Sequence, residues 1–309
     1  MKNVLLYIAF LLMVMPSCQS AKEVYLFSTF REPADKGLFL AYSFDGLNWE
    51  DLGGPWLAPE VGTQKVMRDP SVVSGPDGTF HMVWTSSWRG DLGFGYASTK
   101  DFINWSPQQL IPVMDFDTST VNVWAPELFY DQYQKEYIII WASTIPYKFE
   151  RGIEAEDNNH RMYYTTTRDF QNFSETKLFI DPKFSVIDAV IVERGIGDYV
   201  LVLKDNTRPE RNLKVAFGPS PLGPYKNISE PFTGQFTEGP TLIRKDDAWY
   251  IYYDAYELKR YGLHKTTDFI HFEDVSDQVK LPEGHKHGTI FKADRRLLKN
   301  LIKANKKAK

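Results

Sequence analysis

Residues 99–105 read TKDFINW, and this seven-residue pattern returns along the chain. In four copies an aspartate stands four positions before a closing aromatic residue, at 43–49 (SFDGLNW), 99–105, 167–173 (TRDFQNF) and 267–272 (TDFIHF). A weaker copy spans 217–225 (FGPSPLGPY), and the closing aromatic residues lie 56, 68, 52 and 47 positions apart. A period of about fifty residues is typical of propeller blades, each a small sheet of about four strands.

The segments between the copies are short runs rich in Val, Ile, Tyr and Trp, with almost no helical periodicity. Such runs, bounded by turns, indicate β-strands. We therefore predict an all-β fold, a five-bladed β-propeller, with a two-layer sandwich as the alternative. Clear examples are 80–84 (FHMVW), 137–141 (YIIIW), 199–203 (YVLVL) and 249–253 (WYIYY).

The two ends of the repeat array are each incomplete. The first repeat, 24–49, has no blade-opening segment before it, and the last opening segment, 287–291 (HGTIF), has no strands after it. Together they make one blade, so strands from both chain ends are expected to close the ring and remove open sheet edges. The long interval before residue 173 is explained by a polar insertion at 147–160.

The N-terminal region is expected to direct export. Residues 1–17 read as a lipoprotein-type signal peptide, with Lys2 followed by an apolar run at 4–14 that is short for a membrane-spanning helix. The only cysteine, Cys18, follows directly, where a lipoprotein signal places its acylated residue. We expect a lipid anchor at Cys18, a linker over 18–22 and a location in the bacterial envelope, in the periplasm or on the outer membrane. A plain cleaved signal with an incidental cysteine is the alternative.

Charge is unevenly distributed over the chain. The formal net charge is −4, but the tail at 293–309 carries about +6, so the region 18–292 is near −11. An acidic body argues against nucleic acid as a partner, because a basic surface supplies most of that affinity. The tail follows the predicted propeller, 23–292, and its leucines recur at helical spacing. It is either a short amphipathic helix that docks on the propeller or a frayed basic end, and we favour the frayed end.

Acidic residues gather where the blades open. Four of the five opening segments place an acid in or near the first position, directly before an apolar run. Acids there are costly to bury unless they face a wet cavity, and the first strand of each blade lines the central channel. The segments are 68–73 (RDPSVV), 124–129 (WAPELF), 187–191 (IDAVI), 238–243 (EGPTLI) and 287–291 (HGTIF).

This ordered set of motifs closely resembles glycoside hydrolase family 43, five-bladed propellers that act on arabinose- and xylose-containing polysaccharides. The resemblance spans roughly 24–291 and implies that Asp69 is the general base, Asp188 orients and tunes the acid, and Glu238 is the general acid. Two positions depart from the family pattern, since Glu127 stands where Asp is frequent and Ala189 where Pro is frequent. Neither removes a catalytic group, although Glu127 could alter a sugar-binding subsite.

Glycoside hydrolysis needs one carboxylic acid for the leaving oxygen and one carboxylate to activate water. Carboxyl groups about 6.5–9.5 Å apart leave room for that water and invert the anomeric centre. We expect burial near Asp188 to raise the pKa of Glu238 and to keep its proton near neutral pH. No cofactor is required for this chemistry.

Further residues are candidates for binding. Trp88 and Trp124 are sugar platforms or blade-packing residues, and Arg260 is a sugar contact or a solvated loop residue. The resemblance places His287 over the channel near a hydrated ion, which we predict to be a structural calcium, while a hydrogen bond to a neighbouring blade is the alternative.

The leading interpretation is an exported inverting exo-glycosidase that acts on oligo- or polysaccharide, releasing terminal α-L-arabinofuranose from plant polysaccharide side chains. A β-xylosidase or an exo-galactanase of the same family is the first alternative, and a non-catalytic carbohydrate-binding propeller is the second. The Arg68-Asp69-Pro70 motif is also similar to that of retaining fructan-acting enzymes, but their Asn-Asp-Pro and Glu-Cys motifs do not occur here.

Overall fold

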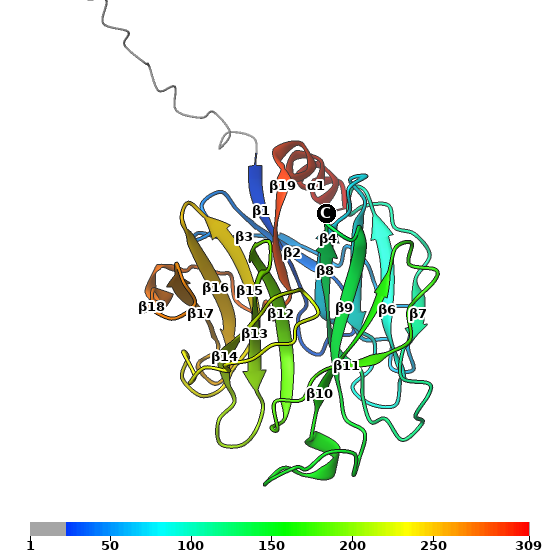
Figure 1. Cartoon of the computed structure of the whole chain (residues 1–309). Helices are drawn as coiled ribbons and strands as arrows, with labels where there is room; N and C mark the ends of the chain where they lie inside the picture. The colour runs from blue at the N-terminus through cyan, green and yellow to red at the C-terminus, as the bar shows by residue number, and fades with distance from the viewer. Residues whose placement is uncertain (1–22, 309) are drawn as a thin grey trace, which may run out of the picture.

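The computed structural model describes residues 23–308, which form five small antiparallel sheets arranged around a common axis (Figure 1). The predicted all-β, five-bladed propeller is confirmed. The signal peptide 1–17 and the linker 18–22 with Cys18 lie outside the described residues. No helix within the described range is long and apolar enough to cross a membrane.

Each blade is a meander whose first strand lies nearest the axis. Blade 1 contains β19 (Thr289–Asp294), β1 (Glu23–Thr29), β2 (Phe39–Ser43) and β3 (Glu50–Gly53). Blade 2 contains β4 (Arg68–Ser74), β5 (Phe80–Thr85), β6 (Gly93–Thr99) and β7 (Gln109–Pro112). Blade 3 contains β8 (Trp124–Asp131), β9 (Glu136–Ser143), β10 (Arg161–Thr167) and β11 (Lys177–Ile180). Blade 4 contains β12 (Val186–Gly195), β13 (Asp198–Asp205) and β14 (Asn212–Gly218), and blade 5 contains β15 (Thr237–Lys245), β16 (Ala248–Ala255), β17 (Arg260–Thr266) and β18 (Glu273–Asp274).

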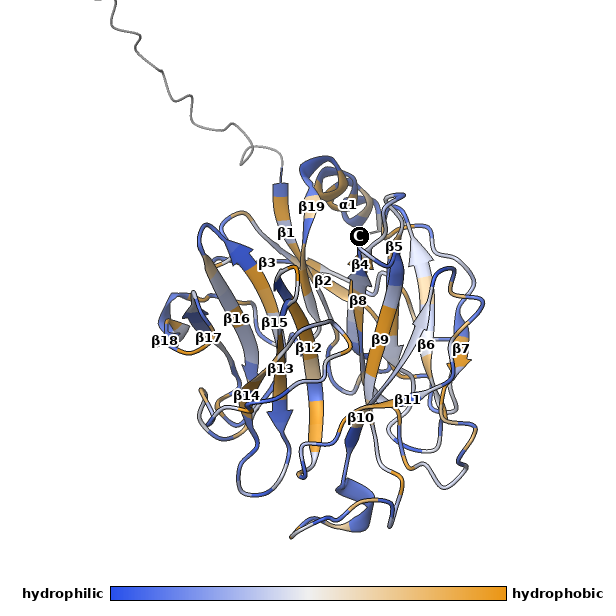
Figure 2. Ribbon diagram, in the orientation of Figure 1, coloured by the Kyte–Doolittle hydropathy of each residue, from blue (hydrophilic) through white to orange (hydrophobic). Residues whose placement is uncertain are grey.

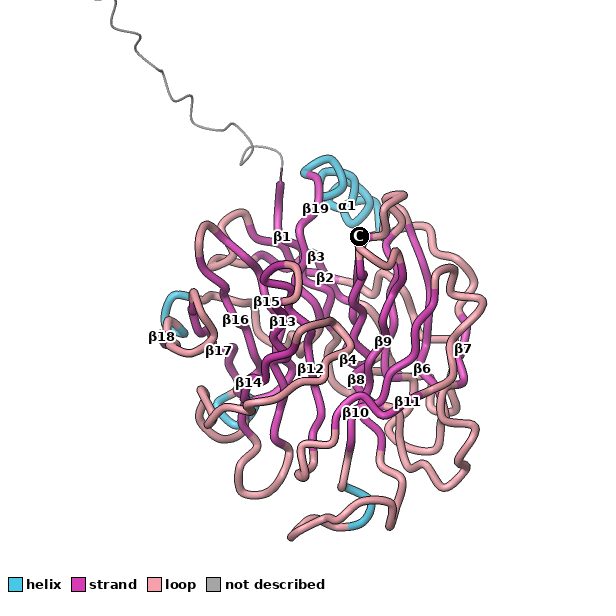
Figure 3. Tube along the Cα trace, in the orientation of Figure 1, coloured by secondary structure: helices cyan, strands magenta, loops and turns pink. Residues whose placement is uncertain are grey.

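Helices are confined to the connections and the C-terminus (Figure 3). Within residues 23–308 there are three single-turn 3₁₀ helices, η1 (Glu156–Asn158), η2 (Tyr256–Leu258) and η3 (Ser276–Gln278), and one α-helix, α1 (Arg295–Ala308), which follows β19. The predicted insertion lies between β9 and β10 and contains η1.

The two ends of the described chain close the ring. β1 pairs antiparallel with β19, from Glu23 opposite Asp294 to Ser28 opposite Thr289. The N-terminal strand therefore supplies the second position of blade 1 and the C-terminal strand its innermost position. This confirms the predicted closure by both ends, and it leaves the innermost strands of the five blades in contact around the axis.

The repeated sequence motif forms the same turn in four blades, between the third and fourth strands. In blade 2, Asp101 Oδ1 accepts the backbone N–H groups of Ile103 and Asn104 at 2.9 and 2.7 Å, and Thr99 Oγ1 accepts that of Phe102 at 2.9 Å. Equivalent bonds occur at Asp45, Asp169 and Asp268. The Asp side chain thus replaces a backbone partner within the turn, which is why the motif needs a short acid at that position.

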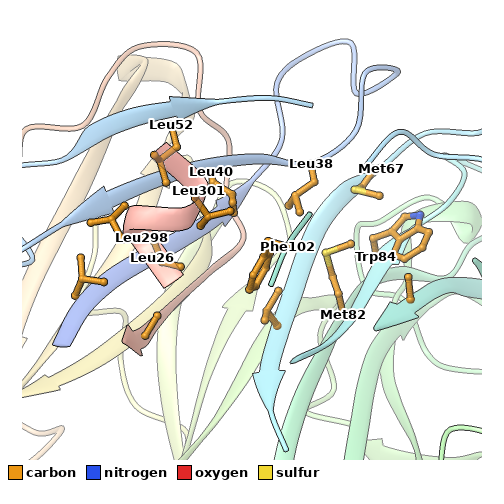
Figure 4. Packing of buried hydrophobic residues seen from close by; sticks show 14 residues of the cluster. Leu26, Leu38, Leu40, Leu52, Met67, Met82, Trp84, Phe102, Leu298 and Leu301 are labelled. Carbon is orange, nitrogen blue, oxygen red and sulfur yellow. The ribbon is translucent and has the colours of Figure 1, made fainter. Parts of the chain in front are cut away.

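The blades pack against one another through apolar faces. One cluster joins blades 1 and 2 and includes Leu26, Leu38, Met82, Trp84 and Phe102, each fully buried (Figure 4). Because consecutive side chains of a strand point to opposite faces, each blade presents an apolar face to both neighbours. The ring is therefore held by side-chain packing between sheets that share almost no backbone hydrogen bonds.

The C-terminal tail is a docked helix. Leu298 and Leu301 of α1 are 3% and 0% exposed, and they pack on Leu26, Leu40 and Leu52 of blade 1 (Figure 4). Lysines occupy the outward face and leucines the face toward blade 1, so α1 is amphipathic (Figure 2). The frayed end that we favoured is wrong, because the leucine stripe meets an apolar surface that blade 1 leaves open at this end of the ring.

We expect Leu301→Ala to lower the free energy of unfolding by about 2–5 kcal/mol, the usual cost of truncating a buried leucine. Chemical denaturation followed by tryptophan fluorescence measures the change. The matched control is Lys303→Ala on the exposed face of the same helix, which is expected to change stability by about 0.5 kcal/mol or less. Equal effects from both variants would show that the helix is not docked in solution.

Candidate active site

The first strands of four blades share a backbone irregularity at the axis. The pairing register shifts near the start of β4, β8, β12 and β15, and one residue there adopts a left-handed conformation. These residues are Asp69 (φ 52°), Ala125 (φ 45°), Asp188 (φ 49°) and Gly239 (φ 56°). A bulge re-aims the side chains around it. For a residue other than glycine, the positive φ costs about 1–3 kcal/mol, and such strain is common at functional sites.

Aligning the bulges shows that the four acids are not equivalent. Asp69 and Asp188 occupy the left-handed position itself, Glu238 precedes it by one residue and Glu127 follows Ala125 by two. The acids therefore reach the axis at different heights and in different directions, which allows them to have different roles.

Asp69 has one fixed and one free carboxylate oxygen. Thr85, at the end of β5, donates a hydrogen bond to Oδ2 at 2.7 Å and accepts one from the backbone N–H of Ala125 at 2.8 Å. Oδ1 lies 3.2 Å from Nδ1 of His287 and has no hydrogen bond within the described residues. Asp69 is thus oriented by blades 2 and 3 while one of its oxygens faces the centre.

Glu238 lies across the axis against two nitrogen atoms. Oε2 accepts a hydrogen bond from Nζ of Lys204 at 2.8 Å, and Oε1 lies 3.4 Å from Nε2 of His287. Lys204 is 2% exposed and comes from the end of β13 in the neighbouring blade, whereas 23% of the Glu238 side chain remains exposed. The carboxylate is therefore held from one side and open on the other.

His287 stands between Asp69 and Glu238 and reaches both with its two ring nitrogens. Burial alone would lower its pKa, but the Asp69 and Glu238 carboxylates outweigh burial and raise the pKa of His287 to about 9. The ring is accommodated because residue 239 is glycine, since a Cβ there would lie 2.1 Å from Cγ of His287. The imidazole is accordingly a cation at neutral pH, placed between two carboxylates.

Asp188 acts on the backbone beside Glu238. Its Oδ2 accepts the N–H of Gly239 at 3.1 Å, which fixes the strand at the residue after Glu238. Burial raises the pKa of Asp188, although the charges of His287 and Lys204 oppose that shift. This is the geometry of a residue that positions its neighbour.

The charge state that we expected for Glu238 is wrong. Burial does act to raise its pKa, but Lys204 and His287 outweigh burial and hold the pKa well below its ordinary value. Burial and the neighbouring acid Asp188 alone would raise this pKa, but β13 brings the Lys204 ammonium within 2.8 Å of the Glu238 carboxylate. In this structure Glu238 is therefore ionised at neutral pH.

Glu127 also faces the axis. It lines a narrow central cavity of about 20 Å³ together with Asp69, Asp188 and His287, which is space for about one water molecule. Burial, with a smaller contribution from Asp188, raises the pKa of Glu127 to about 8. The added methylene relative to aspartate thus extends a neutral carboxyl group into the channel.

An aromatic wall borders the centre on the side of blades 2 and 3. The rings of Trp88 and Trp124 lie 4.8 Å apart, and His160, at the end of the insertion, stacks on Trp124 at 4.9 Å. Trp88 is 48% exposed, and the guanidinium of Arg68 lies 4.7 Å from its ring. Both tryptophans are therefore partly accessible, although Trp124 also packs on the core between blades 3 and 4.

Arg260 lies apart from these groups. Its side chain is half-exposed at the start of β17, 3.6 Å from Asp277, and it lines a separate cleft beside blade 5. The structure thus brings Asp69, Glu127, Asp188 and His287 together around the central cavity, with Glu238 against His287, and places Trp88 and Trp124 at its edge.

The predicted calcium near His287 stays a prediction. Ligand atoms of Asp188, Glu238 and His287 lie within 4.8 Å of one another, which is close enough to share an ion. Calcium, however, prefers six to eight oxygen ligands, and here Glu238 already has the ammonium of Lys204 and the cationic ring of His287 as partners. This donor set, as arranged, does not fit a directly bound calcium.

Sequence reasoning missed Lys204 and Thr85. Both lie at the end of the second strand of a blade, Lys204 as the residue before the last in β13 and Thr85 as the last residue of β5. The second strand runs antiparallel to the first, so its end lies beside the start of the first strand, where the acids stand. A polar residue closing the second strand was therefore the signal that could have identified them.

We expect Lys204→Met to raise the pKa of Glu238 by roughly one to three units, because an opposite charge at this range lowers a carboxyl pKa by that amount. Carbon-13 NMR of the labelled side-chain carboxyls, followed over pH, measures the shift. The control is Lys214→Met, which removes a similar ion pair, 2.8 Å long, from Asp205 in the same blade and should leave Glu238 unchanged. An unaltered Glu238 titration in the Lys204 variant would contradict the ion pair.

Comparisons with known proteins identify relatives of the chain and of its fold. Residues 21–296 match a family model described as a probable glycosyl hydrolase domain related to glycoside hydrolase family 43. A curated α-L-arabinofuranosidase of Bifidobacterium longum is 30% identical over 115 residues, which are 34% of this chain. The match covers only 10% of that relative's length.

Solved structures share the propeller. An α-L-arabinofuranosidase from Lactobacillus brevis superposes with a TM-score of 0.54 at 17% identity, covering 68% of this chain and 72% of that one. An exo-β-1,3-galactanase from Phanerochaete chrysosporium has a TM-score of 0.53 at 12% identity and covers 71% and 53%. At these identities the likeness shows the fold alone. The family model, in contrast, covers nearly the whole propeller, and the chain therefore belongs to this probable glycosyl hydrolase family, related to glycoside hydrolase family 43.

Proposed function

We propose that the protein is an exported, inverting exo-glycosidase in which Asp69 is the general base and Glu238 the general acid. The observation that carries this proposal is the placement of their carboxylates on different blades, on either side of the His287 ring. A ring between them keeps the two carboxyl groups too far apart for direct contact. Such spacing favours inversion over a covalent glycosyl intermediate.

Asp69 is suited to activate water. Thr85 holds one carboxylate oxygen, whereas the other makes no hydrogen bond with the described residues and lies 3.2 Å from Nδ1 of His287. A water at that oxygen would give up a proton to Asp69 as it attacks the anomeric carbon.

Glu238 must take up a proton before it can protonate the leaving oxygen. Its open side is the one that a sugar would cover, and loss of water there raises the pKa of a carboxyl group. His287 Nε2 is the proton source placed nearest, 3.4 Å from Oε1. Transfer of that proton leaves a neutral imidazole and a neutral Glu238, which then donates the proton to the departing oxygen. Asp188 fixes the strand at Gly239 while this occurs.

The site is walled in a way that supports attack at chain ends. The insertion is anchored by buried Glu154, whose Oε1 accepts the N–H of Arg208 at 2.7 Å, and by buried Arg161, which donates to the carbonyl of Glu150 at 3.0 Å and to Oδ1 of Asn159 at 2.8 Å. It therefore forms a firm barrier beside Trp124. Since relatives of the chain and of its fold are named α-L-arabinofuranosidases, we propose terminal α-L-arabinofuranose as the sugar released.

A β-xylosidase or exo-galactanase of the same family is the second candidate, because an exo-β-1,3-galactanase is among the proteins that share the fold. We also propose that Cys18 carries a lipid anchor and that the enzyme works at the bacterial envelope. This rests on the signal-like segment 1–17 alone.

We expect the purified protein to hydrolyse p-nitrophenyl α-L-arabinofuranoside faster than the β-xyloside or the β-galactoside. Proton NMR of the first-formed sugar should show the anomer opposite to that of the substrate. Release of the same anomer would establish retention and remove Asp69 as the base, whereas faster xyloside or galactoside cleavage would move the proposal to the second candidate.

Leaving-group dependence separates the acid from the base. Glu238→Gln should lose about 10²–10⁴-fold in kcat/KM on natural glycosides, and far less on a 2,4-dinitrophenyl glycoside, whose leaving group needs little protonation. Asp69→Asn should be impaired on both substrates, because water must be activated in each case. If Asp69→Asn is the variant rescued by the good leaving group, the two roles are reversed.

A further inference from the structure

A cleft of about 900 Å³ lies between blade 5 and the chain segment that crosses from η3 to β19. The ends of β16 and β17 form one wall, through Asp254, Tyr256 and Arg260, and the segment 276–286 forms the other. Neither the acids at the axis nor the aromatic wall contribute to its lining. Its volume is within the range of ligand-binding clefts.

The cleft adjoins Glu238. Asp254, in the cleft wall, is the direct cross-strand partner of Glu238 in the β15–β16 pair. The ring of Tyr256, also in the wall, lies 5.4 Å from Nζ of Lys204, whose ammonium holds Glu238. The Glu238 and Asp254 carboxylates also add to the effect of burial in raising the pKa of Tyr261, another lining residue. These contacts place the cleft on the acid side of the centre, away from Asp69.

The chemistry of the reaction determines on which side of the site the leaving group lies. A general acid stands beside the leaving oxygen, and a base with its water stands on the opposite face of the sugar. Whatever is attached to the leaving oxygen must therefore lie beyond Glu238. The central cavity of about 20 Å³ is too small for a sugar ring, whereas the cleft begins where the leaving group would emerge.

The lining suits an uncharged, polyhydroxylated ligand. Four basic and three acidic side chains face the cleft, and several are already paired, Lys286 with Asp254 at 3.0 Å and Arg260 with Asp277 at 3.6 Å. Charges that neutralise one another do not call for an ionic ligand, but they offer donors and acceptors to hydroxyl groups. Val279, Leu281 and Pro282 add apolar surface for the carbon-bound face of a sugar ring.

We propose that this cleft binds the saccharide unit on the leaving-group side of the scissile bond, and that Arg260 contributes to its affinity. The proposal rests on the proposed function, in that it takes Glu238 as the proton donor. It gives the enzyme a preference for substrates with a sugar on both sides of the bond.

Calorimetry on the Glu238→Gln background separates binding from hydrolysis. We expect Arg260→Ala to weaken the binding of α-1,5-arabinobiose about tenfold or more, the scale of a lost charged hydrogen bond, while L-arabinose binding changes less than about twofold. Xylobiose and β-1,3-galactobiose are measured in parallel. The matched control is Arg168→Ala, an exposed arginine of blade 3 that lies 3.9 Å from Glu136 and should affect no sugar.

Kinetics on the otherwise unaltered enzyme gives the second readout. Arg260→Ala should raise KM for the disaccharide with little change in kcat, and should spare the p-nitrophenyl glycoside, which has no second sugar. Equal loss on the disaccharide and the aryl glycoside, or no loss relative to Arg168→Ala, would overturn the cleft proposal alone. If the wild type cleaves no glycoside but disaccharide binding still depends on Arg260, the proposed function fails and the cleft remains a saccharide site.

Discussion

The pairing of β19 with β1 is the contact on which both the fold and the site depend. It joins strands from opposite ends of the described chain and completes blade 1. His287 directly precedes β19, so the same pairing delivers its ring to the axis, between Asp69 of blade 2 and Glu238 of blade 5. Ring closure and assembly of the charged centre are therefore one event, and a chain that lacked β19 would lose both.

Charge balance explains how several acids can share so small a space. Carboxylates at close range and out of water repel one another and lose hydration, which raises their pKa values. Lys204 and His287 offset this for Glu238, while Asp188 and Glu127 receive less compensation and are shifted toward their neutral forms. The consequence is an unusual resting state, in which the proposed acid is ionised and the nearest available proton resides on His287. Proton donation then becomes coupled to the arrival of a ligand that covers Glu238.

Much of this architecture could be predicted from repeats, because local hydrogen bonding determines them. The turn at Asp101 is built within seven residues, so each clear copy of its sequence pattern marks one blade. The incomplete repeats at the two ends of the array imply that the chain ends together close the ring. The parts that could not be predicted depend on contacts between distant segments. Lys204 meets Glu238 across two blades, and Leu301 finds its apolar partners in blade 1, some 250 residues earlier in the sequence. The pKa of Glu238 was misjudged for the same reason, since its sign is decided by a neighbour that no local pattern reveals.

The asymmetry of the ring gives the site a direction. Rigid aromatic surface and the anchored insertion lie beside blades 2 and 3, next to the group that would activate water. The larger, mixed-polarity cleft lies between blade 5 and the segment leading to blade 1, next to the group that would protonate the leaving oxygen. Meanwhile α1 covers blade 1 at the opposite end of β19 from His287, so this helix takes no part in either wall (Figure 1). Asp69 occupies the left-handed position of the bulge in β4, whereas Glu238 stands one residue before that position in β15. The base side and the acid side of the site are therefore not interchangeable. A saccharide can therefore be oriented across the axis by the backbone irregularity itself, before any loop-specific contact selects which sugar it is.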